Sequence, residues 1–194
     1  MNRSLLSSAK YDYGTPQGLF DCLNARLDFS CDLAADASNA KCKWFFDAQT
    51  DSLSVAWDEA VCRMGLRPSP IEGCAAGGEG SLVVCPTSAW LNPPYGRQLP
   101  KFVRHAVECC AAAPDQLTVV ALLPARTDTA WWHDFVARPE NTVFLLRGRL
   151  RFEGMAASAP FPSAIVVFGA PPWSRVACEV ALGLMDGGYR FVAR

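Results

Sequence analysis

The sequence predicts an α/β fold in which a mostly parallel central sheet is flanked by helices. Residues 117–124 (LTVVALLP) form a continuous apolar run of β-branched residues and leucine, which is typical of a parallel strand buried on both faces. Residues 163–169 (SAIVVFG) form a second strong strand pattern. Segments with helical spacing separate such runs, and strands that alternate with helices build a sheet covered on both faces.

The N-terminal part of the chain predicts one helix and a short first crossover. Thr15 and Pro16 indicate a helix start, because threonine caps helices well and proline suits the first helical position. Residues 27–36 predict a short strand that ends in acidic and small residues. Residues 43–57 carry a second apolar segment, and the spacing leaves too little chain for a full helix and another strand between the two.

The amino-acid composition changes at about residues 62–81. This stretch is rich in glycine and proline and predicts a mobile loop, which we interpret as an insertion. The chain has 194 residues, of which 51% are apolar and 19% charged, so residues 1–194 predict a single domain around that loop. After the loop, an apolar run leads into WLNPPYG (90–96). Beyond it, the pattern predicts helices over 99–112, 128–137 and 174–186 and strands over 117–124, 142–148 and 163–169.

Composition excludes several classes of protein. The formal net charge is −1, which argues against a protein that coats nucleic acid non-specifically. A local basic patch is still compatible with this net charge. The nine cysteines form no CxxC pair, and no paired His, Cys or Asp spacing predicts a metal site. The cysteine usage and the lack of a signal-peptide pattern predict reduced thiols in the cytoplasm. No apolar run reaches the roughly 18 residues of a membrane span.

The segment from Asn92 to Tyr95 predicts a rigid corner at the end of a strand. Pro93 and Pro94 cannot continue a strand or a helix, because each lacks an N–H and has a fixed φ. The Asn92 side-chain oxygen and the Pro93 carbonyl can accept the two hydrogens of an exocyclic amine and so direct its lone pair at an electrophile. Tyr95 can stack on a planar substrate that has been pulled out of a helix. With a sulfonium methyl as electrophile, this corner suits methyl transfer to an amine.

The sequence NPPY resembles the catalytic motif of amino-methyltransferases that use S-adenosylmethionine. More of the chain is similar to the small phage-type DNA adenine-N6 methyltransferases. NPPY is also found in glutamine-amide methyltransferases of release factors, so its combination with LPARTDT and GRLRF…APFPSA is the more specific signal. The similar segments are YGTPQGLFDCLN (13–24), DLAADASNAKC (32–42), DSL with W (51–57), WLNPPYGR (90–97), LLPARTDTAWWHD (122–134) and RGRLRFEG…SAPFPSAIVVFG (147–169).

The resemblance implies a Rossmann-like class I methyltransferase fold and a specific reaction. The expected reaction is transfer of a methyl group from S-adenosylmethionine to N6 of adenine in double-stranded DNA, with the target adenine flipped out. The implied setting is the cytoplasm of a bacterial host, with a phage or prophage gene. One departure is visible, because the glycine-rich cofactor loop of methyltransferases is absent and CDLAADA (31–37) stands in its place.

The resemblance also implies roles for individual residues. Asn92, Pro93, Pro94 and Tyr95 would be catalytic. Most of the predicted cofactor residues have a structural alternative. Thr15 and Pro16 could simply start a helix, Asp32 and Asp36 could lie in solvated turns, and Asp51 could cap a helix. The predicted cofactor-binding residues are Thr15, Pro16, Asp32, Asp36, Asp51 and Asn92. Phe45, Phe46 and Trp57 are better interpreted as core residues than as residues that stack on the cofactor.

Basic residues near the expected carboxyl edge of the sheet predict contacts with DNA phosphates. Lys101 and Arg104 share one face of a predicted helix. Arg147, Arg149 and Arg151 recur at period 2, which predicts one positive face of a strand or hairpin, with a solvated edge strand as the alternative. The full predicted set is Arg97, Lys101, Arg104, Arg126, Arg147, Arg149 and Arg151.

Two other interpretations stay open at the level of sequence. One is an amino-methyltransferase for another target, either cytosine N4 or a protein glutamine. The other is a catalytically silent relative that binds DNA or cofactor. The intact NPPY favours catalysis, and the missing glycine-rich loop favours silence.

Overall fold

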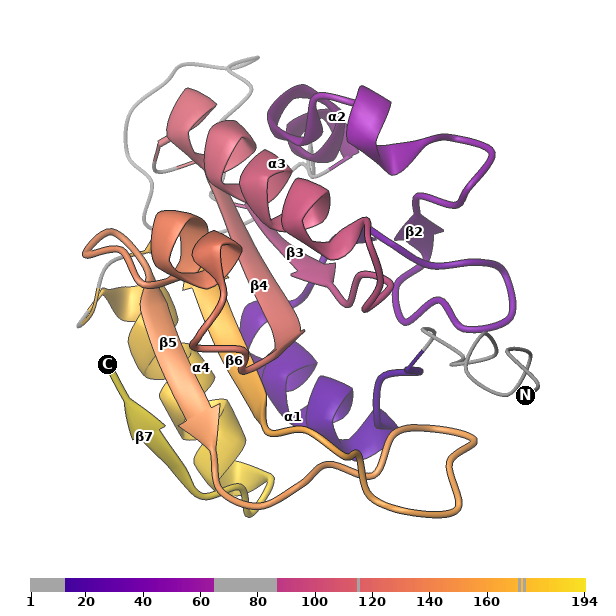
Figure 1. Ribbon diagram of the computed structural model, residues 1–194. Coiled ribbons are helices and arrows are strands. Elements are labelled where there is room, and N and C mark those ends of the chain that lie inside the picture. The colour runs from indigo at the N-terminus through magenta and orange to yellow at the C-terminus, as the bar shows by residue number, and fades with distance from the viewer. Residues whose placement is uncertain (1–12, 65–86, 115, 171, 173) are drawn as a thin grey trace, which may run out of the picture.

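The computed structural model describes residues 13–64, 87–114, 116–170, 172 and 174–194, which form a mixed α/β structure (Figure 1). Within these residues the strands form one seven-stranded sheet in the order β2-β1-β3-β4-β6-β5-β7. The strands are β1 (Cys31–Asp32), β2 (Trp44–Phe45), β3 (Thr87–Leu91), β4 (Leu117–Pro124), β5 (Thr142–Leu146), β6 (Ser163–Phe168) and β7 (Phe191–Ala193).

The prediction of a mostly parallel sheet is wrong. β1 pairs in parallel with β2 and β3, and β3 pairs in parallel with β4. The remaining pairs, β4 with β6, β5 with β6 and β5 with β7, are antiparallel. The physical reason lies in residues 147–162, which connect β5 to β6 without a helix. A parallel return needs a long crossover, usually a helix, so this connection brings β6 back antiparallel.

Despite the mixed pairing, β1 to β5 run in the same direction. β6 is antiparallel to both of its neighbours, β4 and β5, so these two strands are parallel to each other without touching. The carboxyl ends of β1 to β5 therefore meet at one edge of the sheet. Open α/β sheets bind ligands at this edge.

In the described part of the chain, four α-helices cover the sheet: α1 (Gln17–Leu27), α2 (Trp57–Met64), α3 (Leu99–Ala112) and α4 (Arg175–Asp186). Figure 1 shows α3 in front of the sheet and α1 and α4 behind it. Helices α1 and α4 approach closely at Gly183, where an added Cβ would lie 2.8 Å from the carbonyl oxygen of Cys22. Arg26 also links them through ion pairs with Glu179 and Asp186.

Most predicted elements of the C-terminal half are confirmed. Helix α3, strand β4 and strand β6 have nearly the predicted bounds, and β4 and β6 are buried along their whole length. Helix α4 begins after Ser174, whose hydroxyl accepts the backbone N–H of Ala177. Strand β7 is an addition that the sequence did not indicate.

Other elements differ from their predictions. The helix predicted over 128–137 is a short turn with a π-helical segment, Trp132–Val136. The strand predicted over 142–148 ends at Leu146, so the arginines of 147–151 lie in a loop and form no face of a strand. The strand predicted within 27–36 is only two residues long. The first crossover is short, as predicted, and has no helix before β2.

The predicted 62–81 insertion lies largely outside the described residues. Its first three positions belong to the last turn of α2, which ends at Met64. Residues 65–81 are not described. No helix in the described part of the chain combines the length and the apolar character that crossing a bilayer would require.

Candidate active site

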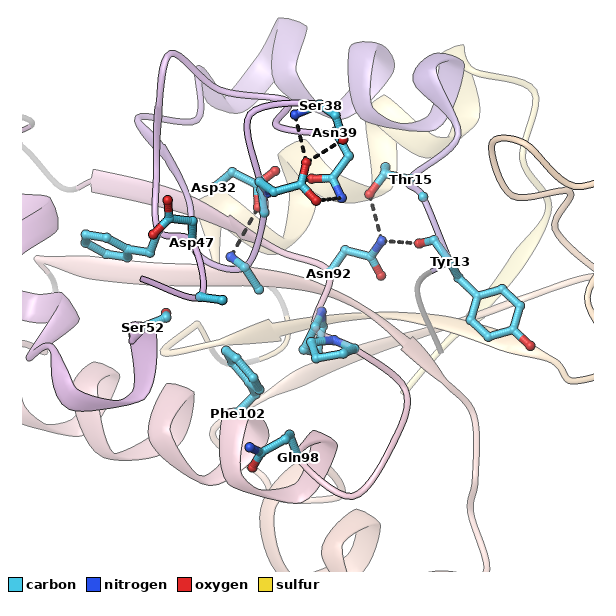
Figure 2. A pocket seen from close by; sticks show the side chains of 18 of the residues that line it. Tyr13, Thr15, Asp32, Ser38, Asn39, Asp47, Ser52, Asn92, Gln98 and Phe102 are labelled. Atoms are coloured by element: carbon cyan, nitrogen blue, oxygen red, sulfur yellow. Dashed lines mark hydrogen bonds between the residues drawn. The ribbon is translucent and has the colours of Figure 1, made fainter. Parts of the chain in front are cut away.

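A cavity of about 750 Å³ opens at the carboxyl edge of the sheet (Figure 2). Its wall comes from the segment before α1, from the turns after β1, β2 and β3, from the start of α3 and from the loop after β5. The cavity brings together most of the residues that the sequence assigned to catalysis and cofactor binding. These are Thr15, Asp32, Asp36, Asp51, Asn92, Pro93 and Pro94.

Asn92 is held in the wall by hydrogen bonds from its amide nitrogen. Nδ2 donates to the carbonyl oxygen of Tyr13 at 2.6 Å and to Oγ1 of Thr15 at 3.0 Å. Figure 2 shows the nitrogen turned toward these two residues and the oxygen turned away. Oδ1 is buried and has no hydrogen-bond partner among the described residues. An orphaned buried acceptor is rare in native proteins, and at the wall of a cavity it is a candidate acceptor for a ligand.

Thr15 and Pro16 separate in the structure. Thr15 is buried and lines the cavity, and its Oγ1 also accepts the indole N–H of Trp90 at 3.3 Å. The N-cap position of α1 is taken by Pro16, with no side-chain cap, so the expected threonine cap is wrong. Pro16 is not among the residues that line the cavity.

Tyr95 lies in the core rather than in the cavity wall. Its ring is 3% exposed, and its hydroxyl donates to the carbonyl oxygen of Leu122 at 2.9 Å. Burial raises the pKa of the Tyr95 hydroxyl well above its usual value. Tyr13 stacks on the Tyr95 ring, and Phe161 and Phe152 meet it edge-on. A flipped base could stack on Tyr95 only after Tyr13 moves.

Asp32 shapes the turn after β1. Oδ1 accepts the backbone N–H of Ala34 at 3.3 Å, and Oδ2 accepts that of Lys41 at 3.1 Å. The side chain is 3% exposed, and burial raises the pKa of its carboxyl group to about 6. The turn that it closes places Ala34 and Ala35 in the cavity wall, where the family's glycines were expected.

Asp36 and Asp51 are exposed at the cavity. Hydrogen bonds from the hydroxyl and backbone N–H of Ser38 lower the pKa of Asp36. Asp51 precedes a 3₁₀ turn, Ser52–Ser54, with φ of 46°, and makes no side-chain cap hydrogen bond. The Asp51 carboxylate therefore does not cap this turn, which was the structural alternative for the residue.

Sequence reasoning missed several residues of this cavity. Asp47 lies two residues after β2, and its Oδ1 accepts the N–H groups of Thr50 and Gln49 and the Thr50 hydroxyl, which lowers its pKa. An acid at the end of the second strand was a usable signal. Phe46, which the sequence placed in the core rather than against the cofactor, and Phe102 of α3 supply apolar wall.

The loop after β5 is tied to the segment before α1 at the cavity. Lys41 Nζ contacts both carboxylate oxygens of Glu153 at 2.8 Å and Oε1 of Gln17 at 2.7 Å. Gly14 forms an isolated antiparallel bridge with Glu153. The Lys41 side chain is only 8% exposed, whereas that of Glu153 is 41% exposed. Nothing in the sequence alone pairs these distant residues.

The basic residues assigned to DNA are all exposed, in segments that follow β3, β4 and β5. The guanidinium of Arg104 lies over the ring of Phe135, 5.4 Å from its centroid. Arg151 Nε donates to the carbonyl oxygen of Met155 at 3.0 Å. The exposed set is Arg97, Lys101, Arg104, Arg126, Arg147, Arg149 and Arg151. Within the described residues, no group of three or more His, Cys, Asp and Glu side chains is arranged to hold a metal ion.

Comparison with known proteins gives one family match. Residues 84–163 match a family model described as DNA N-6-adenine-methyltransferase (Dam). This segment contains the NPPY corner, β4, β5 and the loop after β5. No curated protein matches the sequence.

A solved structure, protein LPL1258 from Legionella pneumophila str. Philadelphia 1 of family DUF519, shares 13% identity over 84% of this chain, with a TM-score of 0.43. The chain spans 58% of that protein's length, and a likeness at this level carries no argument about fold or function. The family match instead confirms the resemblance seen in the sequence: residues 84–163 are similar to the DNA N-6-adenine-methyltransferases.

Proposed function

We propose that this chain is a DNA methyltransferase with a Rossmann-like class I domain over residues 1–194. It transfers a methyl group from S-adenosylmethionine to N6 of adenine in double-stranded DNA. The family match supports the chemistry. The observation that carries the proposal is the Asn92 amide, whose nitrogen is fully used within the protein while its buried oxygen has no donor among the described residues.

The cavity residues fit S-adenosylmethionine. A volume of about 750 Å³ lies in the usual range for small-molecule sites. Carboxylates of Asp36, Asp47 and Asp51 at the cavity suit an ammonium group, ribose hydroxyls and an adenine amine. Phe46 and Phe102 give apolar surface for a purine. Asp32 contributes chiefly by closing the turn, because both of its oxygens already accept backbone N–H groups.

The chain's own contribution to the reaction is to prepare the amine. When bound, S-adenosylmethionine supplies an electrophilic sulfonium methyl group. Asn92 Oδ1 accepts one hydrogen of the target amine, and the carbonyl of Pro93 accepts the other. Both acceptors concentrate the nitrogen lone pair and orient it, which matters more in the transition state than in substrate binding. Pro93 has no N–H that would compete as a donor.

The exposed basic residues would hold the duplex at the same edge. Arg97, Arg126 and the 147–151 loop follow the strands whose carboxyl ends meet at the cavity. Phosphate contacts from these residues would position the DNA while the target adenine is flipped into the site. The cytoplasm of a bacterium that carries a phage or prophage is the setting that the resemblance implies.

Incubation of the purified protein with labelled S-adenosylmethionine and unmethylated double-stranded DNA tests the proposal. Nucleoside mass spectrometry should detect N6-methyladenine, and Asn92→Ala should form it far more slowly. N4-methylcytosine would favour the cytosine enzyme, and label on a release-factor glutamine would favour the protein enzyme. Cofactor binding without any transfer would indicate the catalytically silent relative.

A further inference from the structure

We infer that Trp90 and Thr15 are positioning residues for Asn92: together with the Tyr13 carbonyl, the chain of hydrogen bonds Trp90–Thr15–Asn92 holds the Asn92 amide with its oxygen toward the substrate. The inference rests on the proposed function, because it gives Asn92 Oδ1 the task of accepting a hydrogen from the target amine. It adds a role for two residues that are remote in sequence from each other and do not themselves contact the reacting atoms.

The polarity of this arrangement follows from the partners of Nδ2. A backbone carbonyl can only accept hydrogen bonds, so the Asn92 atom 2.6 Å from the Tyr13 oxygen has to be the nitrogen. An inverted amide would place two acceptor oxygens at that distance. The hydrogen-bond network therefore decides the amide orientation without ambiguity, and it leaves Oδ1 as the unpaired atom.

Thr15 supplies the second acceptor for the Asn92 amide nitrogen. Its Oγ1 lies 3.0 Å from Asn92 Nδ2 and 3.3 Å from Trp90 Nε1. The indole N–H is a donor only, and Trp90 is fully buried, so Thr15 is the group that satisfies it. Trp90 in turn packs against Phe20 and Phe29, with ring centroids 5.7 and 5.5 Å away. The threonine hydroxyl is thus held from one side by a rigid indole and holds the amide on the other.

The local sequence explains why both donors reach one hydroxyl. Trp90 is the penultimate residue of β3, and Asn92 follows two positions later. In an extended chain, side chains two positions apart point to the same face. Trp90 and Asn92 therefore both face the segment before α1, where Thr15 is 4% exposed.

Two replacements of Thr15, one that removes the hydroxyl and one that keeps it, test the inference. Thr15→Val removes the acceptor and keeps the shape, whereas Thr15→Ser keeps the hydroxyl. We expect kcat to fall about 10–100-fold in Thr15→Val, since small misplacements of a reactive constellation have effects of this size. Thr15→Ser should recover kcat to within about threefold. The Kd for S-adenosylmethionine, measured by calorimetry, should change by less than about threefold in both variants.

A readout independent of activity is the nuclear magnetic resonance signal of the Trp90 indole N–H and the Asn92 side-chain amide. Trp90→Phe and Asn92→Ala identify the two signals. In the parent both groups should exchange slowly with water, and in Thr15→Val both should shift and exchange faster, with recovery in Thr15→Ser.

The outcomes separate this inference from the proposed function. A parent protein that methylates no amine would overturn the function, while the resonance signals would still test the hydrogen-bond chain. Unchanged signals or unchanged kcat in a folded Thr15→Val protein would overturn the inference. A loss of cofactor affinity as large as the loss of kcat would make Thr15 a cofactor contact instead. If Thr15→Val does not fold, Trp90→Phe serves, with an expected fall in kcat of about 3–10-fold, and parental kcat would contradict the chain.

Discussion

Tyr13 stacks on Tyr95, with ring centroids 5.3 Å apart and ring planes inclined by 29°. Tyr13 also contacts Phe152 and Phe161, both at 5.0 Å between centroids. The backbone oxygen of the same Tyr13 accepts the Asn92 amide. The segment before α1 therefore both orients the proposed acceptor and covers the aromatic face on which a flipped base was expected to stack.

Removing the Tyr13 ring should uncover Tyr95 without disturbing Asn92, because the carbonyl of residue 13 remains. We expect Tyr13→Ala to lose about 1–3 kcal/mol of unfolding free energy from aromatic packing, and to keep or raise kcat/KM for DNA. Tyr13→Phe is the matched control and should resemble the parent in both. A folded Tyr13→Ala enzyme whose kcat/KM drops more than about tenfold would mean that the Tyr13 ring is itself part of the base site.

Asn92→Ala should affect the chemical step far more than cofactor binding. Removal of one preorganised polar group from an active site typically lowers kcat by about 100–1000-fold. Single-turnover kinetics and calorimetry with S-adenosylmethionine separate the two effects. Turnover like that of the parent would contradict the assigned role of the Asn92 oxygen.

The salt dependence of DNA binding should show whether the arginines of the 147–151 loop contact DNA phosphates. Each neutralised phosphate contributes roughly 0.9 to the log–log slope, so a variant with both Arg149→Ala and Arg151→Ala should show a lower slope. Arg138 and Arg175 provide the matched control, because they lie before β5 and after β6, at the opposite edge of the sheet. A slope that falls only in the control double variant would place the duplex on that opposite edge.

The buried Asp32 carboxyl should destabilise the protein as it ionises. Its folded pKa of about 6 lies above the ordinary aspartate value of 3.8, so its favourable contribution is present below pH 3.8 and is lost as the pH rises through 6. The shift corresponds to about 3 kcal/mol. Denaturation of the parent and of Asp32→Asn at several pH values should show the difference between them changing within this window. Asp36→Asn, at an exposed carboxylate, is the control, and a parallel pH profile for Asp32→Asn would contradict the assignment.

The Lys41–Glu153 ion pair should stabilise the contact between the loop after β5 and the loop that connects β1 to β2. Lys41→Met and Glu153→Gln, alone and combined, form a double-mutant cycle, and we expect a coupling of about 1 kcal/mol because one partner is buried and the other half-exposed. Urea denaturation measures the unfolding free energies, and limited proteolysis reports on the 147–162 loop. Strictly additive effects of the two substitutions would show that the pair contributes nothing.

Local sequence patterns predicted the parts of this protein that depend on neighbouring residues. The apolar run of β4 and the helical period of α3 reflect burial and spacing along one segment. The corner at Asn92 follows from two prolines, which stop any regular element whatever surrounds them. Its position after a strand was enough to place the cavity at the carboxyl edge of the sheet.

Only the tertiary structure decided how distant segments meet. A strand covered on both faces is equally apolar whether its neighbours are parallel or antiparallel, so the direction of β6 depended on a connection without a helix. A threonine before a proline looks the same in the sequence whether it caps a helix or binds Asn92. Thr15 binds Asn92 because β3 lies beside it in the fold. Tyr95 was expected in the open site, yet the ring of Tyr13 covers it. Hydrogen bonds and ring contacts between residues some 77 and 82 positions apart are set by how the sheet brings its strand ends together, and no local pattern encodes that.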